Sequence, residues 1–136
     1  MIALVDTSIW SLALRRKRHL LSAEETRRVV VLEEIIAEGR ARLAGPVRQE
    51  LLSGIRHAEQ FVGLREYLRS FPDVPLYIED YERAAELRNT CQQHGIIGSP
   101  IDFLLCSIAI DRSWAIYTGD RDFERYARHI PITLLD

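Results

Sequence analysis

Short apolar segments alternate with longer helix-forming segments along this chain, and that alternation limits the folds available to it. Residues 2–5 and 114–118, for example, are strand-length segments that are apolar on both faces. Strands buried on both faces are typical of a parallel sheet covered by helices on each side. The sequence therefore predicts the α/β class, as a three-layer α/β/α sandwich with a central, mainly parallel sheet.

Capping and turn signals divide the rest of the chain. Ser22 and Glu25 match a capping box, and Gly39 marks the end of the helix that follows. Pro46 and Pro100 each occupy a position favoured at the start of a helix. Strands are expected at residues 2–5, 41–44, 74–78, 114–118 and 132–134, and helices are expected to begin near residues 7, 22, 45, 99 and 122, with another ending at residue 95.

Two of these helices have informative apolar patterns. Residues 103–110 are apolar nearly all round, which predicts a central buried helix. In the helix before it, Tyr81, Ala84, Ala85 and Cys91 are expected to face inward.

Length and composition bound the class of protein. We predict a single domain over residues 1–136, a length that can bury a substantial core. The longest uncharged apolar segment, residues 103–110, is far shorter than the roughly 18 residues of a membrane span. The N-terminus lacks the basic start of a secretory signal, and Cys91 and Cys106 match no metal spacing or disulfide framework. These features predict a cytoplasmic protein with no membrane partner, in which Cys106 is a buried thiol.

Basic residues are unevenly distributed. The formal net charge of −2 gives no overall attraction for nucleic acid. A dense basic run nevertheless contains Arg15, Arg16, Lys17 and Arg18. Arginine forms forked hydrogen bonds with phosphates and stacks on bases. The run could contact RNA or could form a solvated helix face, and the sequence leaves both open.

Four acidic residues occupy positions that a parallel sheet would bring together. Asp6 and Asp120 directly follow expected strands, and ligands of such sheets bind beyond the carboxyl ends of the strands. Glu50 and Asp102 lie near the starts of expected helices, which begin at the same edge after a short loop. The four carboxylates could therefore converge.

Each acid also has a purely structural interpretation. Glu50 could be a solvated helical residue, and Asp102 could stabilise a helix dipole. Asp6 could cap a helix, Asp120 could be a turn residue, and Asp122 could cap the helix that follows it.

A metal site explains all of the acids together. Several of them adjoin apolar segments, where an unpaired carboxylate is costly and a divalent cation would compensate it. Oxygen ligands favour Mg²⁺ or Mn²⁺, and the four histidines are too scattered to form a competing cluster. Carboxylate-bound Mg²⁺ typically activates water to hydrolyse phosphodiesters, without a nucleophilic side chain.

Four segments in this order, "LVDTSIW", "QELLSG", "SPIDFLLCSIA" and "YTGDRDF", resemble PIN-domain proteins, and among them the VapC-type ribonuclease toxins of prokaryotic toxin–antitoxin pairs. The resemblance covers essentially the whole chain. It implies that the family's acidic quartet corresponds to Asp6, Glu50, Asp102 and Asp120, which would be both catalytic and metal-binding. It adds Asp122 as a further metal ligand; whether Asp122 or Asp120 is the closer ligand stays open, with Asp120 favoured because it lies nearer the strand end.

The resemblance also implies supporting roles for Thr7, Ser8 and Thr118. The chain departs from its relatives in having Pro100 before Asp102 and larger side chains after it, for which we expect tighter packing and no loss of chemistry.

The resemblance implies Mg²⁺- or Mn²⁺-dependent endonucleolytic cleavage of structured RNA, often tRNA or rRNA. It also implies a homodimer and a cognate antitoxin that inserts a C-terminal segment toward the acidic groove. The alternatives are a PIN-domain protein of RNA processing and a non-catalytic RNA- or protein-binding scaffold, which would be expected to lack one of the acids. Haloacid-dehalogenase-like phosphatases are disfavoured because Asp6 is followed by Thr7 and Ser8, and response regulators because Lys17 is the only lysine.

Overall fold

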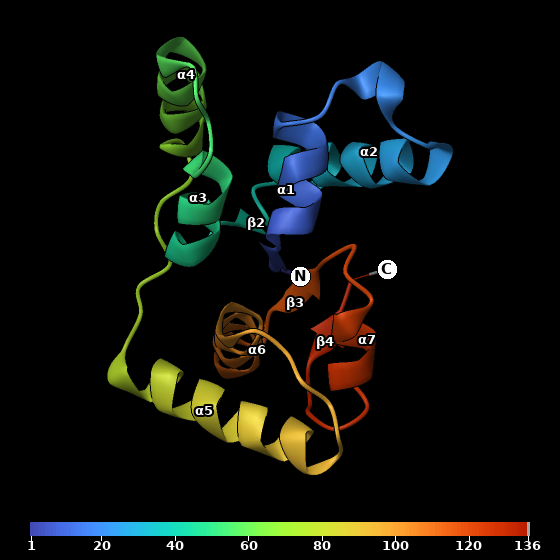
Figure 1. The fold of residues 1–136 in the computed structure, drawn as a ribbon, viewed down its shortest axis with the longest axis vertical. Coiled ribbons are helices and arrows are strands. Elements are labelled where there is room, and N and C mark those ends of the chain that lie inside the picture. The colour runs from blue at the N-terminus through green and yellow to red at the C-terminus, as the bar shows by residue number, and fades with distance from the viewer. Residues whose placement is uncertain (136) are drawn as a thin grey trace.

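The computed structural model describes residues 1–135 and confirms the predicted three-layer α/β/α fold (Figure 1). Its strands are β1 (Ala3–Val5), β2 (Ala41–Arg42), β3 (Ala115–Tyr117) and β4 (Thr133–Leu134). They form one sheet in the order β2-β1-β3-β4, and every neighbouring pair is parallel. All four carboxyl ends therefore lie along one edge of the sheet.

Helices cover both faces of this sheet. They are α1 (Thr7–Leu14), α2 (Ala23–Ala37), α3 (Gly45–Leu52), α4 (Ala58–Leu68), α5 (Ile78–Gln93), α6 (Pro100–Arg112) and α7 (Asp122–Tyr126), with a 3₁₀ helix at Arg18–Leu20. In Figure 1, α1 and α2 lie on one side of the strands and α5 and α6 on the other. Every side chain of residues 103–109 in α6 is buried, which confirms the prediction of a central buried helix.

Several local predictions are also confirmed. The capping box of α2 is formed, because Ser22 Oγ accepts from Glu25 N at 3.1 Å and Glu25 Oε1 accepts from Ser22 N at 2.9 Å. Cys91 and Cys106 are buried and free of disulfides within residues 1–135, and burial raises the pKa of both thiols. In that same range, no helix has the length and apolar character needed to cross a membrane.

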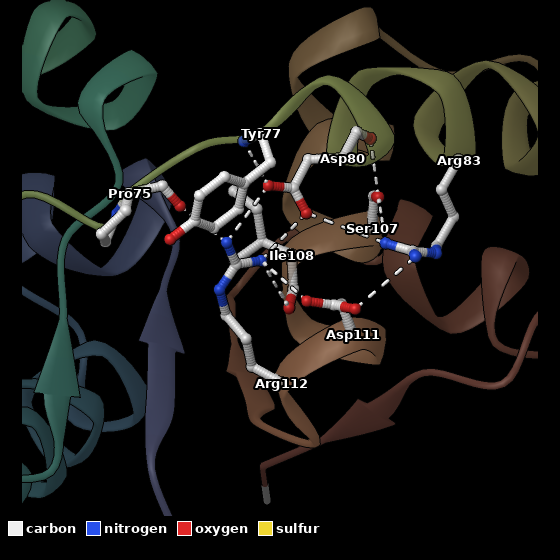
Figure 2. Close-up of polar contacts among 8 residues, drawn as sticks. All are labelled: Pro75, Tyr77, Asp80, Arg83, Ser107, Ile108, Asp111 and Arg112. Atoms are coloured by element: carbon white, nitrogen blue, oxygen red, sulfur yellow. Dashed lines mark hydrogen bonds and ion pairs between the residues drawn. The ribbon is translucent and has the colours of Figure 1, made fainter.

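The strand expected at residues 74–78 is wrong. Only an isolated bridge between Leu43 and Asp73 extends the sheet there, and α5 already begins at Ile78. Pro75 has no N–H to donate to a ladder, and its carbonyl accepts instead from Arg112 Nη2 at 2.6 Å (Figure 2). The hydrogen bond that a neighbouring strand would donate to this carbonyl therefore comes from a side chain of α6.

The helix expected to open near Gly45 is confirmed as α3, but a second helix that was not predicted, α4, follows it. The chain between them turns at Gly54, whose φ of +84° favours glycine. One helix prediction needs correction. In α5, Ala84 and Cys91 are buried as expected, but Tyr81 and Ala85 are exposed. Because α5 packs mainly against α6 alone, it buries a narrower stripe than its apolar pattern predicted.

Candidate metal centre

Asp6 lies at the carboxyl edge of the sheet, between its two central strands. Its N–H donates to the carbonyl of Tyr117 at 2.9 Å, so the pairing of β1 with β3 continues one residue past β1. Asp6 is only 8% exposed. The acid is therefore fixed by the sheet itself.

Two hydroxyl groups orient the Asp6 carboxylate. Thr118 Oγ1 donates to Asp6 Oδ2 at 2.8 Å, and Ser8 Oγ donates to the same oxygen at 2.9 Å. Asp6 stands at the N-cap position of α1 but forms no side-chain capping bond, so its interpretation as a capping residue is wrong. Within residues 1–135 its Oδ1 accepts no hydrogen bond, which leaves that oxygen open to a cation.

Three further carboxylates meet at the same edge. Asp102, Asp120 and Asp122 each offer an oxygen, and these oxygens all lie within 4.8 Å of one another. Asp102 occupies the first turn of α6, where its N–H donates to Ser99 Oγ at 3.1 Å. Asp120 Oδ1 accepts from Asp122 N at 2.9 Å, so Asp120, rather than Asp122, satisfies the first N–H group of α7.

Asp102, Asp120 and Asp122, which we call the acidic trio, place negative charges close together. Burial raises the pKa of the Asp102 carboxyl, and the charges of Asp6 and Asp120 raise it further, against the opposing hydrogen bond from Tyr126. A divalent cation would offset this crowding, and the all-oxygen donor set suits a hard ion such as Mg²⁺ or Mn²⁺. The residues present therefore fit such an ion.

Tyr126 is a member of this site that the sequence did not reveal. Its hydroxyl donates to Asp102 Oδ2 at 2.7 Å, and its side chain is fully buried. A Cβ on residue 98 would clash with this hydroxyl oxygen, so Gly98 leaves the space that Tyr126 needs. Burial and the neighbouring Asp102 carboxylate raise the pKa of the Tyr126 hydroxyl, which keeps it a donor. The sequence contains no short-range pattern that would predict this bond, because Tyr126 lies in α7 and Asp102 in α6.

Glu50 is not one of the three clustered acids. Its side chain is exposed on α3, and its Oε1 accepts from Thr7 Oγ1 at 3.0 Å. Thr7 directly follows Asp6, so this bond holds Glu50 at the rim of the acidic site. Glu50 is therefore more constrained than a free helical glutamate.

The four residues of the basic run are exposed but have different neighbours. Arg15 lines a cavity of about 400 Å³ together with Thr7 and Glu50. Arg16 pairs with an acid of α2 at 3.9 Å, and Arg18 pairs with another at 3.3 Å. Lys17 is the residue before the 3₁₀ helix. Of this run, Arg15 is the residue that shares a cavity with an acid of the predicted quartet, Glu50.

Comparisons with known proteins agree with this architecture. A family model described as "PIN domain" matches residues 3–129. A curated protein of Mycobacterium tuberculosis, "Ribonuclease VapC6", is 28% identical over 89 residues, which are 63% of this chain and 70% of that protein.

Solved structures share the fold at low sequence identity. FitAcB from Neisseria gonorrhoeae matches with a TM-score of 0.75 at 20% identity, over 99% of this chain and 97% of that one. VapBC2 from Rickettsia felis, bound to a DNA fragment from its promoter, matches with a TM-score of 0.76 at 21% identity, over 99% and 98%. VapBC-5 from Mycobacterium tuberculosis, described as a member of the VapBC family of toxin-antitoxin systems, matches with a TM-score of 0.67 at 15% identity, over 99% and 98%.

Proposed function

The chain belongs to the PIN-domain family, and on that premise we propose that it is a metal-dependent endoribonuclease, the toxin of a toxin–antitoxin pair. The curated relative is named a ribonuclease, and one structural neighbour is described as a toxin–antitoxin system. The observation that carries the proposal is the convergence of carboxylates at one sheet edge, three of them with oxygens within 4.8 Å of one another.

We assign the bound ion, Mg²⁺ or Mn²⁺, to the carboxylates of this edge. These are Asp6, Glu50, Asp102 and Asp120, with Asp122 as a further ligand. When bound, such an ion lowers the pKa of water and stabilises negative charge on a phosphate. Asp120 and Asp122 both remain candidates for the closer ligand, because both belong to the acidic trio.

The surrounding hydroxyl groups hold these carboxylates in place before any substrate arrives. Ser8 and Thr118 orient Asp6, while Tyr126 orients Asp102. Such preorganisation matters because misplaced ligands lose both metal affinity and rate. These contacts support an active enzyme over a binding-only scaffold.

RNA and a cognate antitoxin are the proposed partners, and a homodimer in the cytoplasm is the proposed state. For the RNA backbone, Arg15 is the best placed of Arg15, Arg16, Lys17 and Arg18, because it borders the cavity that contains Glu50. A nuclease of RNA processing remains the second candidate, since it would use the same carboxylates.

The proposal is tested by incubating the antitoxin-free protein with total cellular RNA. We expect discrete fragments with Mg²⁺ and none with EDTA or with Asp6→Asn. Glu86→Gln removes an equal charge from the exposed face of α5 and should cut like the wild type. Absence of cleavage by the wild type, or equal cleavage by Asp6→Asn, would contradict the proposal. Mapping the fragment ends would separate a toxin that cuts at one site from a general processing nuclease.

A further inference from the structure

A second charged feature adjoins the metal centre. It is a cavity of about 450 Å³, within the size range of ligand-binding pockets. Thr118 and Asp120 form one part of its lining, and Arg27, Arg28 and Arg121 form another. We call it the arginine cavity. Asp120 belongs both to this lining and to the acidic trio, so a ligand that extends from the acidic trio could enter the cavity.

Arg28 is held in this cavity by contacts on three sides. Its Nη2 pairs with Glu24 Oε1 at 3.1 Å, one turn earlier in α2. Its carbonyl accepts from the hydroxyl of Tyr117 at 2.8 Å, which ties this part of α2 to the end of β3. A Cβ on residue 119 would lie 2.7 Å from Arg28 Nη1, so the guanidinium lies directly against Gly119. A positive charge is therefore fixed beside the loop that leads to Asp120.

The chemistry of the cavity favours a phosphate. A guanidinium offers several N–H donors in a plane, a geometry that matches phosphate oxygens. Arg28 is one-third exposed, and Arg27 and Arg121 form no ion pair within residues 1–135. The donors of Arg27 and Arg121, and the donors of Arg28 that do not pair with Glu24, are therefore available to a ligand.

The balance of charge explains why this phosphate should lie beside a metal. The cavity lining also contains Glu24, Asp120 and Glu124, which offset the three arginines. A divalent cation at Asp120 would neutralise that acid and leave the lining positive. The site therefore suits an anion that arrives together with a bound metal, as the backbone of a nucleic acid does.

We propose that the arginine cavity binds the RNA phosphate next to the one that is cleaved, with Arg28 as its principal donor. This proposal rests on the proposed nuclease function. It makes Arg28 a substrate-positioning residue that fixes the direction in which the strand crosses the acidic site.

The test measures binding of a short fluorescein-labelled single-stranded RNA by anisotropy, at several salt concentrations. EDTA prevents metal-dependent cleavage in one series, and Ca²⁺ fills oxygen sites in the other. Arg28→Gln should weaken binding about tenfold or more in the Ca²⁺ series, because it removes a charge-assisted hydrogen bond. The loss should be smaller in EDTA, where Asp120 keeps its negative charge and offsets the cavity. The slope of log affinity against log salt should fall by about 0.7 for each phosphate that the variant no longer binds.

Arg69→Gln is the matched control. Arg69 also pairs with a glutamate of its own helix region, Glu66 at 3.3 Å, but it does not line the cavity. This variant should bind RNA nearly as the wild type does. Mn²⁺ affinity, measured by calorimetry, should be no lower in Arg28→Gln than in the wild type, since the carboxylates are intact and a neighbouring positive charge is removed.

A second variant moves the guanidinium without removing its charge. In Gly119→Ala the new Cβ would occupy the place of Arg28 Nη1 and displace it, while Ser8 Oγ would be at an ordinary 3.7 Å. RNA affinity should fall as in Arg28→Gln. Gly63→Ala, whose Cβ would meet nothing within 4 Å, should have no effect.

Three results would overturn the proposal. They are no measurable RNA binding by the wild type, unchanged binding in Arg28→Gln, and an equal loss in Arg69→Gln. A special case of the second result is that Arg28→Gln binds RNA normally but binds poly-L-glutamate more weakly than the wild type. That outcome would assign the cavity to carboxylates of a protein partner. If the wild type cleaves RNA but Arg28→Gln binds normally, only this inference fails. If no RNA is cleaved but Arg28→Gln alone loses RNA binding, the nuclease function fails, and the cavity is an RNA-binding site without a cleaved phosphate beside it.

Discussion

At the scale of single residues, hydroxyl groups orient two acids of the candidate metal centre. Asp6 accepts from Ser8 and Thr118, and Asp102 accepts from Tyr126. Asp6 and Asp102 could be predicted from the sequence, because strand ends and helix starts are visible in it. The donor Tyr126 could not, since a buried aromatic side chain in a helix normally indicates only core packing.

Tyr126→Phe should weaken Mn²⁺ binding about tenfold or more, because it removes the hydroxyl that fixes Asp102 and leaves the ring in place. Calorimetric titration measures this affinity, and urea unfolding checks that stability falls by only about 1 kcal/mol. Tyr117→Phe is the matched control: its hydroxyl bonds to the carbonyl of Arg28, so Mn²⁺ affinity should not change. Equal affinity in Tyr126→Phe and the wild type would show that this hydroxyl does not support the metal centre.

At the scale of elements, a buried ion pair joins α5 to α6. Arg112 Nη1 lies 3.0 Å from Asp80 Oδ1, and Nη2 lies 3.1 Å from Oδ2 (Figure 2). Asp80 is 2% exposed and also accepts from the N–H of Tyr77. The same arginine binds the Pro75 carbonyl, so it holds in place the segment expected to be a strand. The sequence could not show this, because the apolar pattern of residues 74–78 is local and Arg112 lies far along the chain.

Asp80→Asn should destabilise the protein by about 3 kcal/mol at neutral pH, because it leaves Arg112 without its buried partner. Urea unfolding measures the loss. Asp73→Asn is the control: its partner Arg48 lies at 2.9 Å, but Asp73 is 69% exposed, so the cost should be at most about 1 kcal/mol. Equal costs for the two variants would contradict a special role for the buried pair.

The Asp80 pair also predicts a pH dependence. The hydrogen bond from Arg112 holds the pKa of the Asp80 carboxyl below its ordinary value of 3.8. A depressed pKa stabilises the fold above the unfolded-state pKa, and this stability is lost as the pH falls through the folded-state pKa. The difference in unfolding free energy between wild type and Asp80→Asn should therefore be constant above about pH 5 and shrink below about pH 4. A difference that stayed constant into acid would contradict this assignment.

At the scale of the whole molecule, the parallel sheet brings distant parts of the chain to one edge. β1 and β3 are neighbours although more than 100 residues separate them, and their ends carry Asp6 and Asp120. The convergence could be predicted, because parallel strands must end together. The finer arrangement of the acids could not be predicted. Asp122 is a member of the acidic trio, whereas Glu50 bonds to Thr7 instead. Both positions depend on loop paths that the sequence does not specify.

Two cavities border the acidic residues. The arginine cavity adjoins Asp120, and the cavity that contains Arg15 adjoins Glu50. An extended strand of RNA crossing the sheet edge could therefore meet arginines in both cavities. On the proposed function, these arginines would let a chain with a negative net charge contact an RNA backbone.

The central claim is that the converging carboxylates bind a divalent cation, and titration with Mn²⁺ followed by electron paramagnetic resonance tests it most directly. We predict that the wild type binds Mn²⁺, and that Asp102→Asn and Asp120→Asn each weaken binding by at least about tenfold, the loss expected even for an outer-shell partner. Glu86→Gln should bind as the wild type does. Equal Mn²⁺ binding by all four proteins, or none by the wild type, would contradict the account.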